Sequence, residues 1–368
     1  MTKNLFIGQM SGTSLDGIDT VLVDFSTPTP TLQKAINTPI PAEIYQSLLT
    51  LRQPEQGSIH QLAELDHEMG HLFADSVKQL LSASEYSAED ITAIGCHGQT
   101  IRHQPNAKIP YTLQIGDPNI IAAKTGITTI ADFRRKDLAL GGQGAPIVPG
   151  YHELIWRNGV HDRMIVNIGG IANLTWLPKD LTQPLLAFDT GPGNTLMNAW
   201  VQQHRSTAYD ENGAWAASGS CIPALLNVLL EDTYFTTSHP KSTGTDYFNL
   251  TWLQPKLQPH YAPEDVQATL LELTAEAIVR SITTVTQATC EIILCGGGAN
   301  NQTLFKRIQQ LSKSNTVTSS DQYQISVDWL EAIAFAWLAK RTLEALPGNI
   351  PSATGASTHA ILGGIYQA

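Results

Sequence analysis

Two glycine-rich turns carry the residues whose types and spacing best suit the binding of a phosphate. Residues 5–25 place Gly, Ser, Thr and Asp between two apolar runs, a pattern that predicts a strand, a tight turn and a second strand. Gly8, Gly12 and Gly17 would let the backbone approach a ligand closely. Successive backbone N–H groups of such a turn, helped by hydroxyl groups, can bind one anion. An ordinary glycine-rich hairpin is the alternative.

A second turn of the same build lies in residues 164–177, where Gly169, Gly170 and Asn173 separate two apolar runs. The repetition favours a pair of phosphate-binding turns, one from each half of the chain. Neither turn fits the commoner motifs. The chain has no GxxxxGK followed by Ser or Thr, and the residues after each turn continue as strand, whereas a dinucleotide fingerprint leads into a helix.

Asp189 is the leading candidate for a catalytic carboxylate. It follows a predicted strand at 185–188 and leads through Gly-Pro-Gly to a predicted helix at 195–204. The N-terminus of a helix favours negative charge by about 0.3–1 kcal/mol, which suits an ionised carboxylate or a nearby phosphate. Capping of the helix is the structural alternative.

Polar residues follow two further predicted strands. The sequence CHGQTIRH at 96–103 follows strand 91–95, and DFRRKD at 132–137 follows strand 128–131. Sheets of α/β proteins place ligand contacts at the carboxyl ends of their strands, so both segments are candidate ligand-binding loops. Loops that only cap the sheet are the alternative. The glycine-rich segment at 141–146 suggests a hinge between domains or a substrate loop.

Two further features suit a ligand site. Gly296, Gly297 and Gly298 lie between a predicted strand and a predicted helix, and bare backbone there lets a flat base or ribose approach closely. Glu331 stands in the first turn of a nearly all-apolar helix predicted at 328–343. A buried glutamate is costly unless it is paired or binds a ligand, which makes Glu331 a site candidate.

The bulk composition indicates an acidic chain that is large enough for two domains. The chain has 368 residues and a formal net charge of -11, with a pI near 5.4. This balance argues against a nucleic acid or an anionic membrane as partner. Its four cysteines are scattered, which is typical of free thiols in a reducing compartment. No apolar run is long enough to span a bilayer and no signal peptide is evident, so a cytoplasmic location is expected.

The chain resembles the anhydro-N-acetylmuramic acid kinases, a family within the group that includes acetate and sugar kinases, actin and heat-shock chaperones. The resemblance rests on blocks that follow one another along essentially the whole chain: IGQMSGTSLDGID, GCHGQTIRHQP, QIGDPNIIAAKTGI, ADFRRKDLALGGQGAPIVP, NIGGIANLT, FDTGPGN, CGGGANN and DWLEAIAFAWLA. It implies an α/β chain of two RNase H-like (actin-like ATPase) domains, with mixed sheets flanked by helices and an interdomain ATP cleft.

The resemblance also implies the domain limits and the reaction. Domain I would comprise 1–137 plus 345–368 with the first phosphate hairpin. Domain II would comprise 138–344 with the second hairpin, the catalytic aspartate and the adenosine loop. The enzyme would use ATP to open 1,6-anhydro-N-acetylmuramic acid hydrolytically and phosphorylate O6. The products would be N-acetylmuramic acid 6-phosphate and ADP, a step of bacterial peptidoglycan recycling.

Roles for individual residues follow from this resemblance. Asp189 would orient and deprotonate the attacking water, and Glu331 would help to hold that water or accept hydrogen bonds from sugar hydroxyls. Arg134 would pair with the lactyl carboxylate, in a sugar pocket lined by His97, Gln99 and Thr100. ATP would be bound by two phosphate turns and an adenosine loop: Ser11, Gly12, Thr13, Ser14, Leu15, Asp16, Gly17, Ile18 and Asp19; Gly169, Gly170 and Asn173; and Gly296, Gly297 and Gly298.

A magnesium ion is expected near Asp16 or Asp19 through water. The expected partners are ATP and the anhydro amino sugar, and the resemblance suggests a homodimer. The chain departs from the family pattern at Asn198, where an acidic residue is common, and at Thr245, where an arginine is common. Two alternatives stay open: a kinase of the same fold that acts on an ordinary sugar hydroxyl, and a nucleotide switch or scaffold without a sugar substrate.

Overall fold

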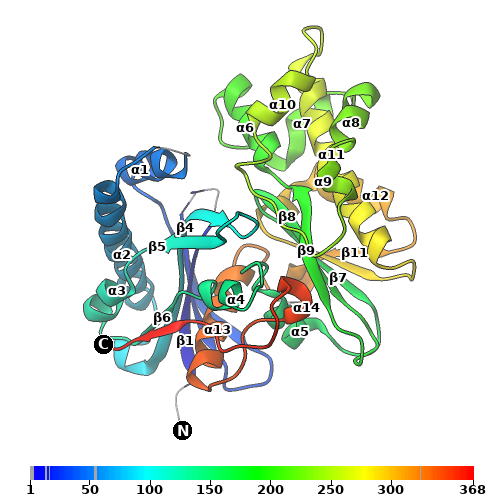
Figure 1. Cartoon of the computed structure of the whole chain (residues 1–368). Coiled ribbons are helices and arrows are strands. Elements are labelled where there is room, and N and C mark those ends of the chain that lie inside the picture. The colour runs from blue at the N-terminus through cyan, green and yellow to red at the C-terminus, as the bar shows by residue number, and fades with distance from the viewer. Residues whose placement is uncertain (1–3, 13–14, 16, 54–55, 324) are drawn as a thin grey trace. The chain divides into compact units, whose positions relative to one another are not determined.

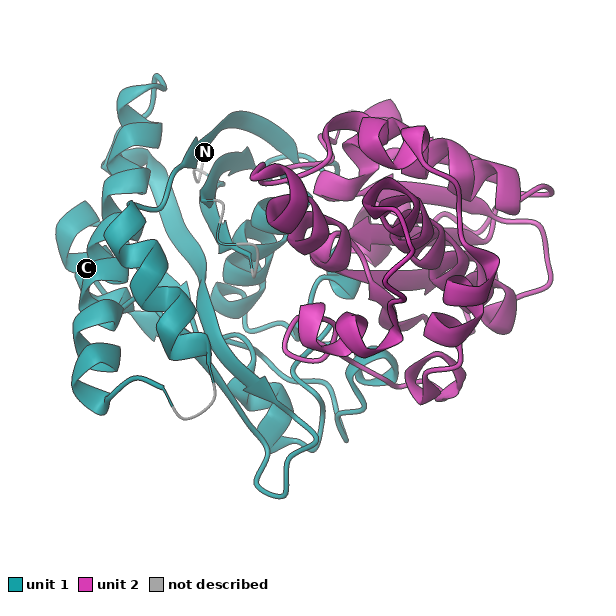
Figure 2. Ribbon diagram, turned by 90° about the horizontal axis from the view of Figure 1, so that it is seen from above, with its two compact units in different colours: residues 1–151, 329–368 teal, residues 152–328 magenta. Residues whose placement is uncertain are grey.

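The chain folds into two compact units, which Figure 2 shows in different colours. The computed structural model describes residues 4–12, 15, 17–53, 56–323 and 325–368, and Thr13, Ser14 and Asp16 lie outside the described residues. Unit 1 comprises residues 1–151 and 329–368, and unit 2 comprises residues 152–328. The predicted limits at 137/138 and 344/345 differ from these, because 138–151 and 329–344 belong to unit 1.

Unit 1 contains a mixed sheet with the order β12-β6-β4-β1-β2-β3, in which β5 pairs with β4 (Figure 1). Its described strands are β1 (Leu5–Ser11), β2 (Ile18–Asp24), β3 (Thr31–Thr38), β4 (Ile91–Gln104), β5 (Tyr111–Ile115), β6 (Thr129–Ala131) and β12 (Gly364–Tyr366). Its helices are α1 (Ala42–Arg52), α2 (Ile59–Ser82), α3 (Pro118–Thr125), α4 (Arg135–Ala139), α13 (Leu330–Leu343) and α14 (Pro351–Thr354). The change of unit falls within α5 (Pro149–Trp156).

Unit 2 contains a second mixed sheet with the order β11-β10-β7-β8-β9. Its described strands are β7 (Arg163–Ile168), β8 (Ile171–Leu177), β9 (Leu186–Pro192), β10 (Glu291–Cys295) and β11 (Thr316–Ser319). Its helices are α6 (Thr195–Arg205), α7 (Ala214–Ser218), α8 (Pro223–Leu230), α9 (Thr233–Thr236), α10 (Leu250–Leu253), α11 (Pro263–Val285) and α12 (Gln302–Leu311).

The two sheets repeat one topology. In unit 1, β3, β2 and β1 are antiparallel neighbours, and β4 and β6 continue the sheet in parallel. In unit 2, β9, β8 and β7 are antiparallel neighbours, and β10 and β11 continue in parallel. This repeated order confirms the predicted α/β fold with two RNase H-like mixed sheets, and both predicted hairpins are confirmed. The ATP cleft between the domains stays a prediction.

The helix α13 belongs to unit 1 because it packs directly on that unit's sheet. A Cβ atom at Gly8 in β1 would clash with the carbonyl oxygen of Ala332, and one at Gly95 in β4 would clash with that of Phe335. Ile7 and Ile94, the neighbours of these glycines, lie instead in the core cluster that contains the buried face of α2. Since successive strand residues face opposite sides, α2 and α13 cover opposite faces of the sheet.

Two strands are longer than predicted, and the predicted hinge is not a boundary between units. Strand β4 runs to Gln104, so the polar segment 96–103 is strand and not loop. Strand β9 runs to Pro192, which places Asp189 inside the strand. The segment 141–146 lies within unit 1, where Gly144 N donates to the buried carboxylate of Asp137 at 2.8 Å.

No single helix among the described residues is long and apolar enough to cross a bilayer. One bent pair of helical segments, Glu211–Ser218 with Pro223–Leu230, has the length and the apolar composition of a span when the two are taken together.

Candidate active site

The β1–β2 turn of unit 1 is held by Gln99 on the neighbouring strand β4. The Ser11 hydroxyl lies 2.6 Å from Gln99 Oε1 and 3.1 Å from the Gly17 carbonyl oxygen, and Gln99 Nε2 donates to the Gly12 carbonyl at 3.2 Å. Gln99 is fully buried. Its amide group thus supports the predicted phosphate turn, and its contact with the sugar stays a prediction.

In the described part of this turn, Leu15 combines a buried side chain with an uncommon backbone conformation. Leu15 has a φ of 62°, which is uncommon outside glycine, while its side chain is buried in the core of unit 1. Ile18 opens β2 and is also buried. A Cβ at Gly17 would meet the side chain of Asn37 in β3, and the contact of Gly17 with ATP stays a prediction. Both Gly8 and Gly17 therefore serve packing between elements.

Asp19 is the described carboxylate next to this turn. It is half-buried, and its Oδ1 accepts a hydrogen bond from Asn37 Nδ2 at 2.8 Å. The described residues contain no group of three or more His, Cys, Asp or Glu side chains arranged to hold a metal ion. Magnesium in phosphoryl-transfer sites is held through one or two carboxylates, water and the phosphates themselves. A carboxylate beside the turn fits that kind of contact.

His97 and Arg134 form a hydrogen-bonded pair in unit 1. Arg134 Nε donates to His97 Nε2 at 2.9 Å, and Arg134 Nη1 donates to the Gly144 carbonyl at 2.7 Å. Because His97 Nε2 accepts, the ring proton lies on Nδ1, which is 2.8 Å from the Gly98 carbonyl oxygen. Burial, and then the Arg134 charge, hold the pKa of His97 well below its usual range. His97 is therefore neutral and orients the guanidinium.

Thr100 and Glu331 are both partly accessible in unit 1. Thr100 Oγ1 accepts from Gln114 Nε2 at 3.1 Å across the β4–β5 pair. Glu331 lies in the first turn of α13 and is half-buried, whereas the sequence predicted a buried residue. Phe335, one turn further along the same face, places its ring centroid 4.8 Å from that of His97. The helix α13 thus contacts His97 through Phe335, one turn after Glu331.

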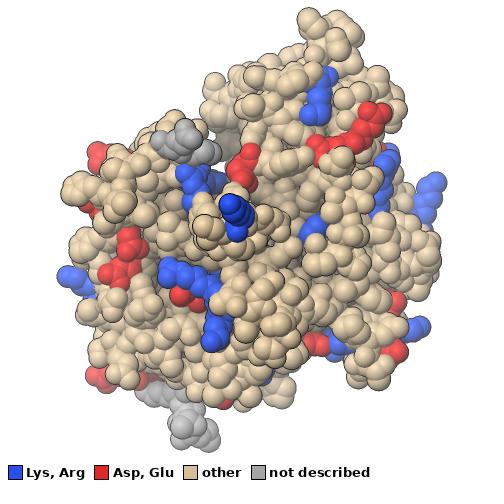
Figure 3. Space-filling view, in the orientation of Figure 1, with Lys and Arg blue, Asp and Glu red and all other residues tan. Residues whose placement is uncertain are grey.

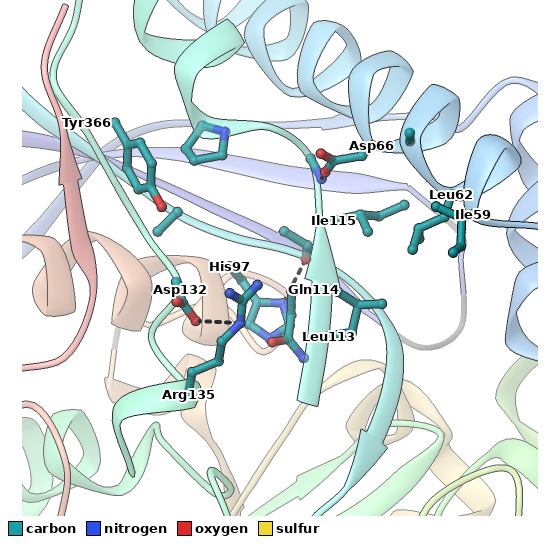
Figure 4. A pocket seen from close by; sticks show the side chains of 15 residues that line it. Ile59, Leu62, Asp66, His97, Leu113, Gln114, Ile115, Asp132, Arg135 and Tyr366 are labelled. Atoms are coloured by element: carbon teal, nitrogen blue, oxygen red, sulfur yellow. Dashed lines mark hydrogen bonds and ion pairs between the residues drawn. The ribbon is translucent and has the colours of Figure 1, made fainter. Parts of the chain in front are cut away.

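A cavity of about 320 Å³ opens in unit 1 where β4 changes its pairing from β6 to β5 (Figure 4). Figure 4 shows the ion pair of Asp132 and Arg135 on one side of the cavity and Asp66 on another. Arg135 Nε lies 3.4 Å from Asp132 Oδ1. Burial raises the pKa of both carboxyls. His97 lines this cavity, but Gln99, Thr100 and Arg134 do not. The prediction that these four residues line one sugar pocket stays a prediction.

In unit 2, a row of polar residues crosses the sheet next to the second hairpin turn. Asn167 in β7 pairs with Asn173 in β8, and Asn173 pairs with Asp189 in β9. Directly paired residues present their side chains on the same face of a sheet. The structure therefore brings the predicted Asn173 and Asp189 together. It adds Asn167, which the sequence reasoning missed although it stands two residues before Gly169, the first of the two turn glycines.

The turn at Gly169 and Gly170 holds the start of α6. Asn194 N donates to the Gly169 carbonyl at 2.8 Å, and Thr195 N donates to the Gly170 carbonyl at 3.1 Å. A Cβ at Gly193 would clash with the Gly169 carbonyl oxygen. The amides of Asn194 and Thr195 at the start of α6 are thus used within the protein, and a negative charge near this helix end stays a prediction.

The three consecutive glycines after β10 have different roles. A Cβ at Gly296 would clash with Asn167, and a Cβ at Gly298 would clash with Ile168. Both glycines therefore allow close packing against the end of β7. A Cβ at Gly297 would meet nothing within 4 Å, and this residue is exposed. Of the three predicted adenosine contacts, Gly297 is the one with open space beside it.

The segment 234–243 surrounds Asp189, and the sequence analysis did not identify it. Thr243 N donates to Asp189 Oδ2 at 2.9 Å, and the Tyr234 hydroxyl donates to the Asp189 carbonyl at 2.7 Å. Asp189 N donates to the Lys241 carbonyl at 3.1 Å. Lysine and threonine in a polar loop give no local signal of such a role.

Charged side chains of both signs are scattered over the surface. Figure 3 shows them interspersed among a majority of uncharged residues on the face in view, without a continuous basic area among the residues drawn in colour.

Comparison with known proteins gives full-length matches. The family model described as anhydro-N-acetylmuramic acid kinase matches residues 4–368. The anhydro-N-acetylmuramic acid kinase of Coxiella burnetii is 50% identical over 370 residues, covering 100% of this chain and 98% of the relative. That of Shewanella amazonensis is 49% identical and covers 100% of both chains. That of Pasteurella multocida is 48% identical over 364 residues, covering 98% of this chain and 96% of the relative.

Similarity to solved structures is weak. The activator of the 2-hydroxyisocaproyl-CoA dehydratase from Clostridium difficile with bound ADPNP gives a TM-score of 0.46 at 12% identity, covering 92% of this chain and 97% of that chain. The assignment therefore rests on the sequence matches that extend over the full length. The chain belongs to the anhydro-N-acetylmuramic acid kinase family.

Proposed function

We propose that the enzyme uses ATP to open the 1,6-anhydro bond of anhydro-N-acetylmuramic acid with water and to phosphorylate O6. The products are N-acetylmuramic acid 6-phosphate and ADP, within peptidoglycan recycling. The full-length family match is the observation that carries this proposal. It also favours a kinase over the nucleotide switch that the sequence left open.

In the proposed reaction, the oxygen of water bonds to C1 while the bond between C1 and O6 breaks. O6 attacks the γ-phosphorus in line and ADP leaves. Asp189 accepts the proton of the water, a role that typically contributes about a hundred- to ten-thousandfold in rate. Support for Asp189 comes from its carboxylate, which is half-buried and held at one oxygen by Thr243 N. Glu331 helps to hold the water or accepts from the sugar hydroxyls.

ATP is bound through the two glycine-rich turns, and Gly297 borders the adenosine. Phosphoryl transfer depends mainly on positioning and on neutralising charge. A magnesium ion supplies part of that neutralisation when it is bound, and Asp19 is the described residue that would hold it through water. Asp16, the other predicted contact, lies outside the described residues.

Arg134 binds the lactyl carboxylate of the sugar. A guanidinium can form two parallel, charge-assisted bonds to a carboxylate, which gives both affinity and orientation. The hydrogen bonds from Arg134 to His97 and to Gly144 support this role because they fix the group before a ligand arrives. We further propose a cytoplasmic homodimer, which light scattering after gel filtration and cell fractionation would test.

The decisive experiment follows labelled water into the product. In H₂¹⁸O the enzyme should place one ¹⁸O at C1 of the phosphorylated sugar, and the ring-opened sugar should be a much poorer substrate. An ordinary sugar kinase would give a product without this label. The variant Asp189→Asn should bind nucleotide normally and lose turnover, while Asp180→Asn, a fully exposed control in the same unit, should retain it. Normal turnover by Asp189→Asn would remove Asp189 from the role of base.

A further inference from the structure

We propose that the segment 234–243 positions Asp189 for catalysis and that the ammonium group of Lys241 stabilises the negative charge of the Asp189 carboxylate. Tyr234, Lys241 and Thr243 are then positioning residues. The inference rests on the proposed function, because it takes Asp189 as the base that accepts a proton from water.

The geometry of the backbone is the first argument. Strand β9 lies at the edge of its sheet, so one side of its backbone has no neighbouring strand to bond. The segment 234–243 supplies partners there: the Lys241 carbonyl accepts from Asp189 N at 3.1 Å, and the Tyr234 hydroxyl donates to the Asp189 carbonyl at 2.7 Å. The backbone N–H and the backbone carbonyl of Asp189 are therefore both fixed by one segment.

The side chain of Asp189 is held by the same segment. Thr243 N donates to Oδ2 at 2.9 Å, which fixes the rotation of the carboxyl group. A base that must meet one proton of a bound water benefits from such an orientation, since a displacement of about 1 Å can cost about a hundredfold in rate. The segment thus sets the place of the carboxylate through three separate hydrogen bonds.

Lys241 occupies a costly position for a structural lysine. Its side chain is nearly buried, its Nζ donates to the Tyr234 carbonyl at 3.0 Å, and Nζ lies 4.6 Å from the centroid of the Tyr234 ring. Burial lowers the pKa of Lys241, and the charge of Asp189 acts in the opposite direction. Lys241 bonds to Asp189 N through its carbonyl and to Tyr234 through its Nζ, and the Tyr234 hydroxyl bonds to the Asp189 carbonyl, so the ammonium belongs to the hydrogen-bonded cluster around Asp189. A positive charge in this cluster favours the ionised form of the carboxylate.

The titratable groups around Asp189 can be named. Lys241 and Tyr234 are the described groups whose pKa values respond to its charge, and burial together with that charge raises the pKa of Tyr234. His239 stacks on Phe188, the residue before Asp189, with ring centroids 5.4 Å apart. Asn173, across the strand pair, carries no charge. Lys241 is thus the cation of this group at neutral pH.

Loss of the Lys241 charge should shift the pH dependence of turnover in one direction. A carboxylate base works when it is ionised, so turnover is lost as the pH falls and the carboxylate takes up a proton. Removal of a nearby positive charge makes protonation easier. In Lys241→Met the acid limb of kcat should therefore move to higher pH, by roughly half a unit to one unit.

Lys256→Met is the matched control. Lys256 is half-buried in the same unit, its Nζ donates to the Trp252 carbonyl at 2.8 Å, and Nζ lies 4.2 Å from the centroid of the Trp252 ring. This variant removes the same charge from the same kind of environment, without an interaction with Asp189. Its pH profile should match that of the wild type, and Lys241→Arg, which keeps the charge, should restore the wild-type acid limb.

The measurements are kcat and KM as functions of pH, with thermal melts to verify folding. An acid limb that is unchanged in folded Lys241→Met, or shifted equally in Lys256→Met, overturns the inference. If Lys241→Met does not fold, Tyr234→Phe decides: kcat should fall about threefold or more with KM unchanged, and an unchanged kcat overturns the proposal. The variant Asp189→Asn distinguishes failure of the proposed function from failure of this inference. Normal turnover in Asp189→Asn would refute the proposed role of Asp189 as the base, and with it this inference.

Discussion

The buried carboxylate of Asp137 gives the most direct test of how unit 1 is held together. It is fully buried and accepts hydrogen bonds from Gly144 N at 2.8 Å, Asn349 Nδ2 at 2.9 Å and Thr354 Oγ1 at 2.8 Å. These three donors come from the segment after α4 and from the C-terminal part of the chain. Replacement by alanine would remove the acceptor that joins them.

The expected loss is large because three donors lose a charged acceptor inside the protein. A hydrogen bond to a charged group contributes about 1.5–3 kcal/mol, and water entering the site recovers part of the loss, so Asp137→Ala should cost about 3–5 kcal/mol. Asp137→Asn keeps one carbonyl oxygen and should cost about half as much. For a unit of this size, about 2–4 °C is lost per kcal/mol, so the Tm of unit 1 should fall by about 6–20 °C in Asp137→Ala.

Differential scanning calorimetry measures this change, and hydrogen exchange at residues 142–144 locates it. The control is Asp75→Ala, because Asp75 forms an exposed ion pair with Lys78 at 3.3 Å that should contribute less than about 0.5 kcal/mol. A Tm of Asp137→Ala within about 2 °C of the wild type would refute the reasoning. Since Arg134 Nη1 donates to the Gly144 carbonyl, the KM for the sugar should also rise in folded Asp137→Asn.

Three further predictions test the ligand contacts. Gly298→Ala should lower the Tm because its Cβ would overlap Ile168, whereas Gly297→Ala should keep the Tm and raise the KM for ATP; equal melting of the two variants would contradict this. Arg134→Met should raise the KM for the anhydro sugar about 10- to 100-fold with little change for ATP, and the neighbouring Arg135→Met should not; an unchanged KM would exclude Arg134 from binding the lactyl carboxylate. EDTA should abolish turnover and magnesium should restore it, so turnover without a divalent ion would contradict the proposed phosphate site.

Local patterns in the sequence predict much of the secondary structure. The helix α2 (Ile59–Ser82) follows from local signals of this kind, because apolar residues repeat at helical spacing and Ser58 with Gln61 forms a capping box at its start. Both glycine-rich hairpins are confirmed for a similar reason: each consists of apolar strands joined by a short turn, and these signals lie within a few residues of one another.

Features that depend on distant partners were not predictable in the same way. Strand β4 continues past residue 95 because residues 99–104 find a partner in β5, and Gly98 takes a φ of 75° where the pairing changes. The helix α13 joins unit 1 because Gly8 and Gly95 leave room for its backbone. Glycines needed for packing and glycines needed for a ligand look alike in a sequence, so Gly8, Gly17, Gly296 and Gly298 were all interpreted as open backbone.

In the candidate site, the contacts of Asp189 also depend on residues that are distant in the sequence. The sequence singles out this residue because an aspartate followed by Gly-Pro-Gly is unusual at the end of an apolar strand. It does not identify Thr243 or Lys241, because their roles come from a main-chain amide and from a buried ammonium group, and neither depends on a local motif. Helix α9 and the polar loop that follows it are linked to the edge of β9 by three hydrogen bonds, and these contacts become visible only in the structure.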